Sequence, residues 1–147
     1  MKKLVGILML LLLAGTVSAQ IIRPVKLSYA ARKISGTEAM LYVKVTIDDG
    51  WHIYSLNQKA GGPLKTSLSF SGNGFSMTGK ITEPKPKRKY EQVFRMDVFY
   101  FENSVLFTQK IKLNQKQVSV QGKIEFMVCN AKECLPPDEV GFTVFIK

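Results

Sequence analysis

The chain has 147 residues, of which 46% are hydrophobic, and it carries a formal net charge of +10. This length suits one domain with a buried core and leaves no room for a second. The sequence has a single histidine and no glycine-rich turn between a strand and a helix. Neither a hydrolase nor a nucleotide-binding function can therefore be argued from its residues. The basic balance suits an acidic protein partner, nucleic acid or an anionic membrane surface.

The amino-terminal residues have the three parts of a secretory signal. Two lysines follow the initiating methionine, an apolar run covers Leu4–Ala14, and Val17-Ser18-Ala19 is a small-residue cleavage site. The alternative is a membrane anchor, but the apolar run is shorter than the roughly 20 residues that a spanning helix needs. We therefore predict a cleaved signal over residues 1–19, one domain over residues 20–147, and export to the periplasm. Export makes nucleic acid the least favoured partner.

The remaining sequence alternates apolar and polar residues with a period of two, which is typical of strands, and no helix is predicted. The expected strands cover Leu41–Ile47, Trp51–Ser55, Thr66–Phe70, Val93–Phe101, Ser104–Leu113, Val118–Cys129 and Val140–Ile146. Glu83–Lys89 is expected to be an exposed loop, because its prolines cannot donate to a sheet and its cations repel one another. Seven to nine short strands predict an all-β, immunoglobulin-like β-sandwich, with a small barrel as the alternative.

The only two cysteines, Cys129 and Cys134, lie five positions apart near the carboxyl end. In an exported protein such a pair is either a small staple or a redox centre. The alternation of the preceding strand puts Val128 in the core and Cys129 on the outward face, near solvent, unless a bulge shifts the phase. As a staple, so short a loop contributes about 2 kcal/mol, whereas an outward disulfide suits exchange with another protein's thiolate. Both interpretations stay open, and metal binding is disfavoured because only one histidine could join the cysteines.

The segment Cys129–Pro137, with paired cysteines followed by an apolar residue and Pro-Pro, resembles the amino-terminal periplasmic domain of the thiol:disulfide interchange protein DsbD. A second segment, Asp49–Ser55, resembles the Asp-Gly-aromatic sequence that precedes the active-site strand in that family. The resemblance covers essentially the whole chain after the predicted signal. The chain departs from the best-known members in having four residues between the cysteines where they have five, and it lacks their transmembrane and thioredoxin-like domains.

The resemblance implies an immunoglobulin-like fold whose cysteine pair cycles between a disulfide and a dithiol, with no metal or organic cofactor. It implies that Cys134 forms the mixed disulfide with a partner and that Cys129 resolves it. His52 and Tyr54 would lie beside the pair. A protonated His52 would favour the thiolate by its charge, and the alternative is an ordinary surface histidine.

The same resemblance implies a lid and a set of partners. The lid would be an aromatic residue within Pro84–Phe94, with Tyr90 as the first candidate and Phe94 as the second. The partners would be periplasmic thioredoxin-like or disulfide isomerase proteins, with a separate membrane protein as electron donor. The cations of Lys85–Lys89 could steer an acidic partner or simply be solvated. The competing hypothesis is a non-catalytic immunoglobulin-like binding module in which the disulfide is a structural clip.

Overall fold

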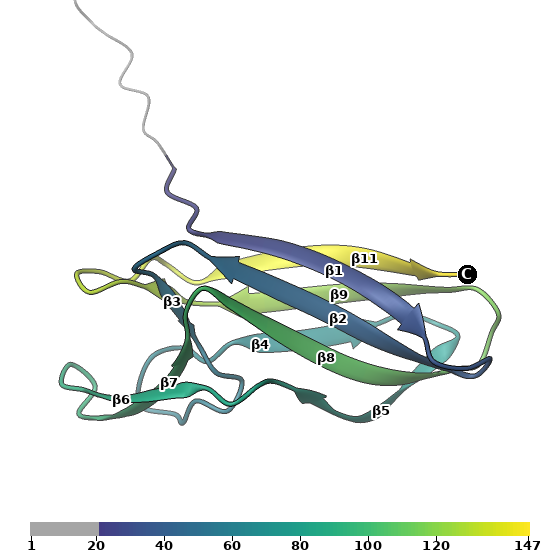
Figure 1. Cartoon of the computed structure of the whole chain (residues 1–147), viewed down its shortest axis with the longest axis horizontal. Coiled ribbons are helices and arrows are strands. Elements are labelled where there is room, and N and C mark those ends of the chain that lie inside the picture. Colours follow the sequence, from purple (N-terminus) through teal and green to yellow (C-terminus); the bar gives the residue numbers. More distant parts are fainter. Residues whose placement is uncertain (1–20) are drawn as a thin grey trace, which may run out of the picture.

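The computed structural model describes residues 21–147, so the predicted signal lies outside the described residues. This part of the chain consists of eleven strands and their connections, without a helix (Figure 1). The strands are β1 (Val25–Lys33), β2 (Glu38–Ile47), β3 (His52–Tyr54), β4 (Ser67–Ser71), β5 (Phe75–Thr82), β6 (Lys87–Glu91), β7 (Met96–Phe101), β8 (Ser104–Leu113), β9 (Val118–Phe126), β10 (Val128–Cys129) and β11 (Asp138–Ile146). The predicted all-β class is confirmed.

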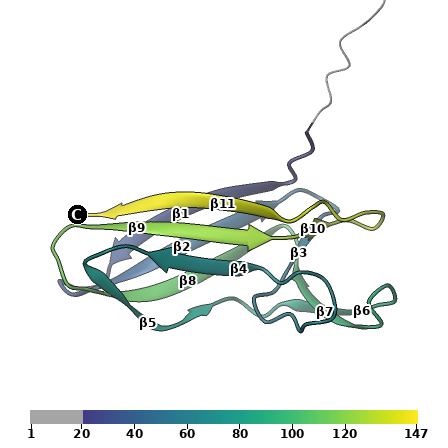
Figure 2. The same cartoon turned by 180° about the vertical axis from the view of Figure 1, so that it is seen from behind.

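Two antiparallel sheets form the layers of a sandwich. One has the strand order β1-β2-β8-β5 and the other β11-β9-β4, and Figure 2 shows the second sheet in front of the first. Alternate residues of β2, β8 and β9 are buried, because successive side chains of a strand point to opposite faces and one face of each sheet meets the other. The core between the layers includes Val43, Phe107 and Ile124.

A third sheet, with the order β10-β3-β7-β6, lies at one end of the sandwich (Figure 2). Within it, Ile53 of β3 pairs with Val128 of β10 and with Phe101 of β7, and all three residues join the main core. The neighbouring residues Tyr54 and Cys129 point to the other face of this sheet, where they form a separate buried cluster. Both faces of the third sheet are therefore covered.

Three strands escape the sequence prediction, namely β6, which is described below, and the two edge strands of the first sheet. β1 and β5 are largely exposed, so that neither alternates cleanly between buried and exposed residues. β5 also contains an irregularity in its pairing with β8 between Thr78 and Thr82, around Gly79 with a φ of 72°. Because an edge strand with a bulge makes few contacts with the core, its sequence need not alternate apolar and polar residues.

The prediction of a loop over Glu83–Lys89 is wrong for its last three residues, which begin β6. The repulsion between these cations is offset by carboxylates across the strand pair. Lys87 forms an ion pair with Glu102 at 2.6 Å, and Arg88 forms one with Asp97. Since Lys89 also has an acidic partner, the basic run offers less unpaired charge to an acidic protein than its sequence suggests.

Candidate functional site

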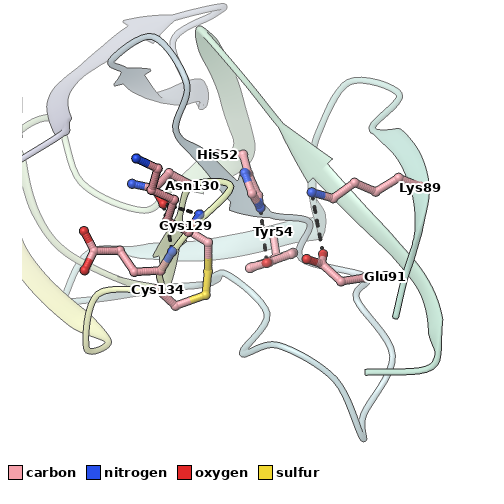
Figure 3. Close-up of a disulfide and its surroundings, with 9 residues drawn as sticks. His52, Tyr54, Lys89, Glu91, Cys129, Asn130 and Cys134 are labelled. Atoms are coloured by element: carbon pink, nitrogen blue, oxygen red, sulfur yellow. Dashed lines mark hydrogen bonds and ion pairs between the residues drawn. A yellow bond between two sulfur atoms is a disulfide. The ribbon is translucent and has the colours of Figure 1, made fainter. Parts of the chain in front are cut away.

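Cys129 and Cys134 form a disulfide at the end of the molecule that carries the third sheet (Figure 3). The loop between them is held by Asn130. Its side-chain oxygen accepts hydrogen bonds from the backbone N–H groups of Lys132 and Glu133, both at 2.8 Å, as in the turns that asparagine favours. The Asn130 N–H donates to the carbonyl of Glu133 at 2.8 Å. None of these bonds involves a sulfur atom, so the loop does not depend on the disulfide alone.

The two cysteines differ sharply in exposure. Cys129 is only 1% exposed, whereas Cys134 is exposed. The prediction that Cys129 lies near solvent is therefore wrong. The parity argument correctly turned it away from the main core, but Tyr54 and Val98 cover the face on which it lies. Cys134 is the cysteine that a protein in solution can reach.

His52 and Tyr54 lie on the same face of the third sheet as Cys129. His52 stands directly opposite Cys129 in the pairing of β3 with β10, and Tyr54 belongs to the same buried cluster as Cys129. Nε2 of His52 is 3.2 Å from the hydroxyl oxygen of Tyr54 (Figure 3). Both side chains are buried. The structure thus brings both residues to the disulfide, and their part in any exchange reaction stays a prediction.

Burial determines the charge states of His52 and Tyr54. It is the main cause that lowers the pKa of His52, and the Lys89 cation lowers it further, against smaller opposing effects of Glu91 and Glu102. Burial also raises the pKa of Tyr54, with the Glu91 carboxylate as the second cause. Near neutral pH, His52 is therefore neutral and Tyr54 keeps its proton. Which of the two donates in their hydrogen bond depends on which ring nitrogen of His52 carries the proton. A neutral histidine cannot favour a thiolate by its charge.

Lys89 and Glu91 of β6 extend this polar cluster (Figure 3). Lys89 Nζ lies 3.6 Å from Oε2 of Glu91 and 4.9 Å from the centroid of the Tyr100 ring. The Tyr100 ring in turn meets the edge of the His52 ring, with centroids 5.3 Å apart. Oε2 of Glu91 is buried and accepts no hydrogen bond from the described residues. No spacing in the sequence connects β6 with the cysteines, so neither Lys89 nor Glu91 could be recognised there as a neighbour of the site.

The turn between β6 and β7 covers the site. Phe94 from this turn and Met96 at the start of β7 pack against the cluster that contains Cys129. Tyr90 does not, because it is 61% exposed and alternates with Lys89 and Glu91, which face the cluster. Of the two lid candidates, Phe94 is therefore the one that packs against this cluster, and a lid role for either residue stays a prediction.

The described residues hold no group of three or more side chains suited to binding a metal ion. Among residues 21–147, no helix is both long and apolar enough to cross a bilayer. The site itself consists of two sulfur atoms beside a histidine and a tyrosine.

Residues 19–145 match the family described as the N-terminal domain of the thiol:disulfide interchange protein DsbD. No protein among the curated sequences matches the chain. The reduced N-terminal domain of DsbD from Neisseria meningitidis is similar in structure, with 14% identity, a TM-score of 0.55, and coverage of 80% of this chain and 82% of that one. The N-terminal periplasmic domain of ScsB from Proteus mirabilis has 14% identity and a TM-score of 0.59, over 86% of this chain and 49% of that one.

A third similar structure is the complex between the DsbD N-terminal and PilB N-terminal domains from Neisseria meningitidis. It has 12% identity and a TM-score of 0.56, over 84% of this chain and 87% of that one. At such identities the likeness shows the shared fold alone. That fold is the immunoglobulin-like β-sandwich predicted from the sequence.

Proposed function

Because this chain belongs to the family of the N-terminal domain of the thiol:disulfide interchange protein DsbD, we propose that it is a thiol–disulfide exchange module. Its Cys129–Cys134 pair passes electrons to or from partner proteins. The observation that supports this best is the asymmetry of the pair, with Cys134 exposed and Cys129 only 1% exposed. One accessible sulfur and one protected sulfur are what sequential exchange requires.

The reaction uses no group beyond the thiols of the two proteins. In the reduced module, the Cys134 thiolate attacks one sulfur of a partner disulfide, forms the intermolecular S–S bond and releases the other partner sulfur as a thiolate. Cys129 then loses its proton and attacks the Cys134 sulfur, which forms the Cys129–Cys134 disulfide and releases the second partner thiolate. Two electrons pass to the partner. The reverse sequence reduces the module.

The surroundings of the pair support this division of roles. Burial disfavours a thiolate at Cys129, so that attack on a partner begins at Cys134. His52 pairs with Cys129 across the strands and is neutral near pH 7. In the tautomer whose Nε2–H donates to Tyr54, its free Nδ1 can accept the Cys129 proton in the resolving step. Phe94 and Met96 cover the buried side of the pair, and the turn that carries Phe94 acts as the lid, which a docking partner displaces.

The family also suggests a place and a set of partners. We place the module in the periplasm, with residues 1–19 as its signal, because its ScsB relative is described as a periplasmic domain. We expect thioredoxin-like or disulfide isomerase proteins as exchange partners, since a similar domain occurs in a complex with the N-terminal domain of PilB. The electrons would come from a separate membrane protein.

The test is the reduction potential of the pair, measured by equilibrating the protein in glutathione buffers and counting alkylated thiols by mass. A value of about −180 to −270 mV, as in exchange proteins, supports the proposal. A value below about −300 mV marks a structural disulfide. That result favours the competing function, a non-catalytic binding module, for which the burial of Cys129 is the supporting observation.

A further inference from the structure

An apolar groove of about 690 Å³ lies beside the disulfide, on the face of β10 opposite His52 and Tyr54. Its lining includes Ile21, Ile22, Val128 and Leu135–Pro137, and the only charged residues in the lining are Arg23 and Asp138. The volume is of the size that binding sites in proteins usually have.

The walls of the groove are unusually exposed for apolar residues. One wall is the chain that leads into β1, where Ile21 is 77% exposed and Ile22 is 57% exposed. The other wall is Leu135–Pro137, which directly follows Cys134. Single exposed apolar side chains are common, but a continuous apolar hollow with such walls is typical of an interaction site.

The groove and the disulfide share one edge. Val128 precedes Cys129, Leu135 follows Cys134, and both line the groove. The Leu135 N–H donates to the Val128 carbonyl at 2.9 Å, which holds the two segments side by side. The exposed Cys134 is therefore a single residue away from the groove wall.

A mixed disulfide at Cys134 would hold the neighbouring residues of the partner close to this groove. The Cα atoms of two bonded cysteines are usually about 5.5–6 Å apart, and an extended chain advances about 3.3 Å per residue. The one or two residues beside the partner's cysteine can therefore reach the groove that begins at Leu135. Apolar side chains gain by leaving water there, whereas polar ones lose hydration and find few hydrogen-bonding groups.

We propose that this groove binds the extended apolar segment beside the reactive cysteine of the exchange partner. The module then selects its partners by the residues that flank their cysteine. This inference rests on the proposed function, because it takes Cys134 as the point of covalent attachment.

The experiment uses the Cys129→Ser variant, in which Cys134 is the only thiol. Oxidised glutathione converts Cys134 into its glutathione mixed disulfide and releases one glutathione thiolate. The peptides Leu-Phe-Cys-Leu-Phe and Ser-Asn-Cys-Ser-Asn, blocked at both ends, are then added together at equal concentration. Each peptide thiolate can displace glutathione without a further oxidant, and the two adducts are counted by intact mass. The apolar peptide should be favoured by about tenfold, the equivalent of burying one large apolar side chain.

Two further substitutions, each made in the Cys129→Ser variant, test whether the groove is the cause of the preference for the apolar peptide. Ile22→Ser removes an exposed wall of the groove and should bring the adduct ratio close to one. Ile34→Ser is the matched control, because Ile34 is 53% exposed and lies in the connection between β1 and β2, at the opposite end of β1 from the groove (Figure 1). It should keep the full preference. Both side chains are more than half exposed, so neither change removes core packing.

The outcomes separate the two proposals. Equal amounts of the two peptide adducts, with a normal glutathione adduct, overturn the groove inference and leave the proposed function standing. Failure of Cys134 to form even the glutathione adduct overturns both. If the oxidised protein sediments as a dimer that Ile22→Ser dissociates and Ile34→Ser does not, the groove is covered by a second copy of the chain and the inference is overturned.

Discussion

The hydroxyl oxygen of Tyr54 lies 3.2 Å from Nε2 of His52, and the side chain of Tyr54 belongs to the same buried cluster as Cys129. Tyr54 thus links the protected sulfur of the pair with the only histidine of the chain. Because the same two side chains are buried, burial is the main cause that shifts their pKa values, and the neighbouring charges of Lys89 and Glu91 act on them second.

Variants that keep only one of the two cysteines should differ in how much covalent complex they form with a partner protein. In Cys129→Ser the exposed Cys134 forms a mixed disulfide that nothing resolves, so covalent complexes should accumulate in the exporting cell. In Cys134→Ser the remaining thiol is buried and should trap little. Non-reducing electrophoresis followed by mass spectrometry measures both. Equal trapping by the two variants would contradict the assignment of Cys134 as the attacking residue.

Phe94 should control access to the disulfide. Phe94→Ala removes a ring that packs against the cluster around Cys129 and should accelerate reduction of the disulfide by dithiothreitol several-fold. Tyr90→Ala is the matched control, since Tyr90 lies in the neighbouring strand β6, is 61% exposed and should leave the rate unchanged. The rates follow from quenched alkylation. A faster reaction in Tyr90→Ala alone would restore the lid role first assigned to that residue.

Glu91 and Lys89 should shift the pKa of His52 in opposite directions. The Glu91 carboxylate raises this pKa and the Lys89 cation lowers it. Glu91→Gln should therefore lower the pKa of His52 further, and Lys89→Met should raise it toward the ordinary value. Glu91→Gln should also lower the pKa of Tyr54. Titration of the ring signals by NMR measures both residues, and shifts of the same sign in the two variants would show that the cluster is arranged differently.

The lowered pKa of His52 should make the protein less stable in mild acid. The unfolded chain binds a proton at His52 at higher pH than the folded protein does, so the free energy of unfolding rises with pH in this window. The loss should begin as the pH falls through about 6.5, the pKa of an unperturbed histidine. It should continue until the pH is below the folded-state value. Denaturant unfolding between pH 8 and pH 5 would measure it, and His52→Gln should remove this part of the pH dependence.

Gly122 should be required for the packing of the second sheet. A Cβ atom at this position would lie 2.2 Å from atoms of the Phe142 ring, which stacks on Tyr29 with centroids 4.7 Å apart. Gly122→Ala should therefore cost about 1–3 kcal/mol of the free energy of unfolding. Gly141 on the adjacent strand has space for a Cβ atom, and Gly141→Ala should not show this loss. Urea denaturation compares the two, and equal stability would contradict the packing described for Phe142.

The sequence predicts well those strands that have one face in the core and one in water. β2, β8 and β9 alternate between buried and exposed residues over their length, so the period of two is visible without the structure. β6 is different, because its cations are balanced by Glu102 and Asp97 outside the strand. Adjacent cations in a sequence suggest mutual repulsion when the carboxylates that pair with them lie elsewhere in the chain.

The same limit applies to the site. The spacing of the cysteines and the alternation of β9 were enough to turn Cys129 away from the main core. They could not reveal that Val98 of β7 joins Cys129 in one buried cluster and that Phe94 of the preceding turn packs against this cluster. These residues lie about 30 positions from Cys129 in the sequence, and only the pairing of β3 with both β7 and β10 brings them to it.

The hydrogen bonds of Asn130 have a consequence for recognition. They fix the backbone around Lys132 and Glu133 through oxygen and nitrogen atoms only, so we expect the outline of this loop to be nearly the same before and after the sulfur atoms separate. A partner that reads only the shape of the loop would then bind the two forms equally well. Under the proposed function, a partner would have to distinguish the reduced form from the oxidised form by the sulfur of Cys134 itself.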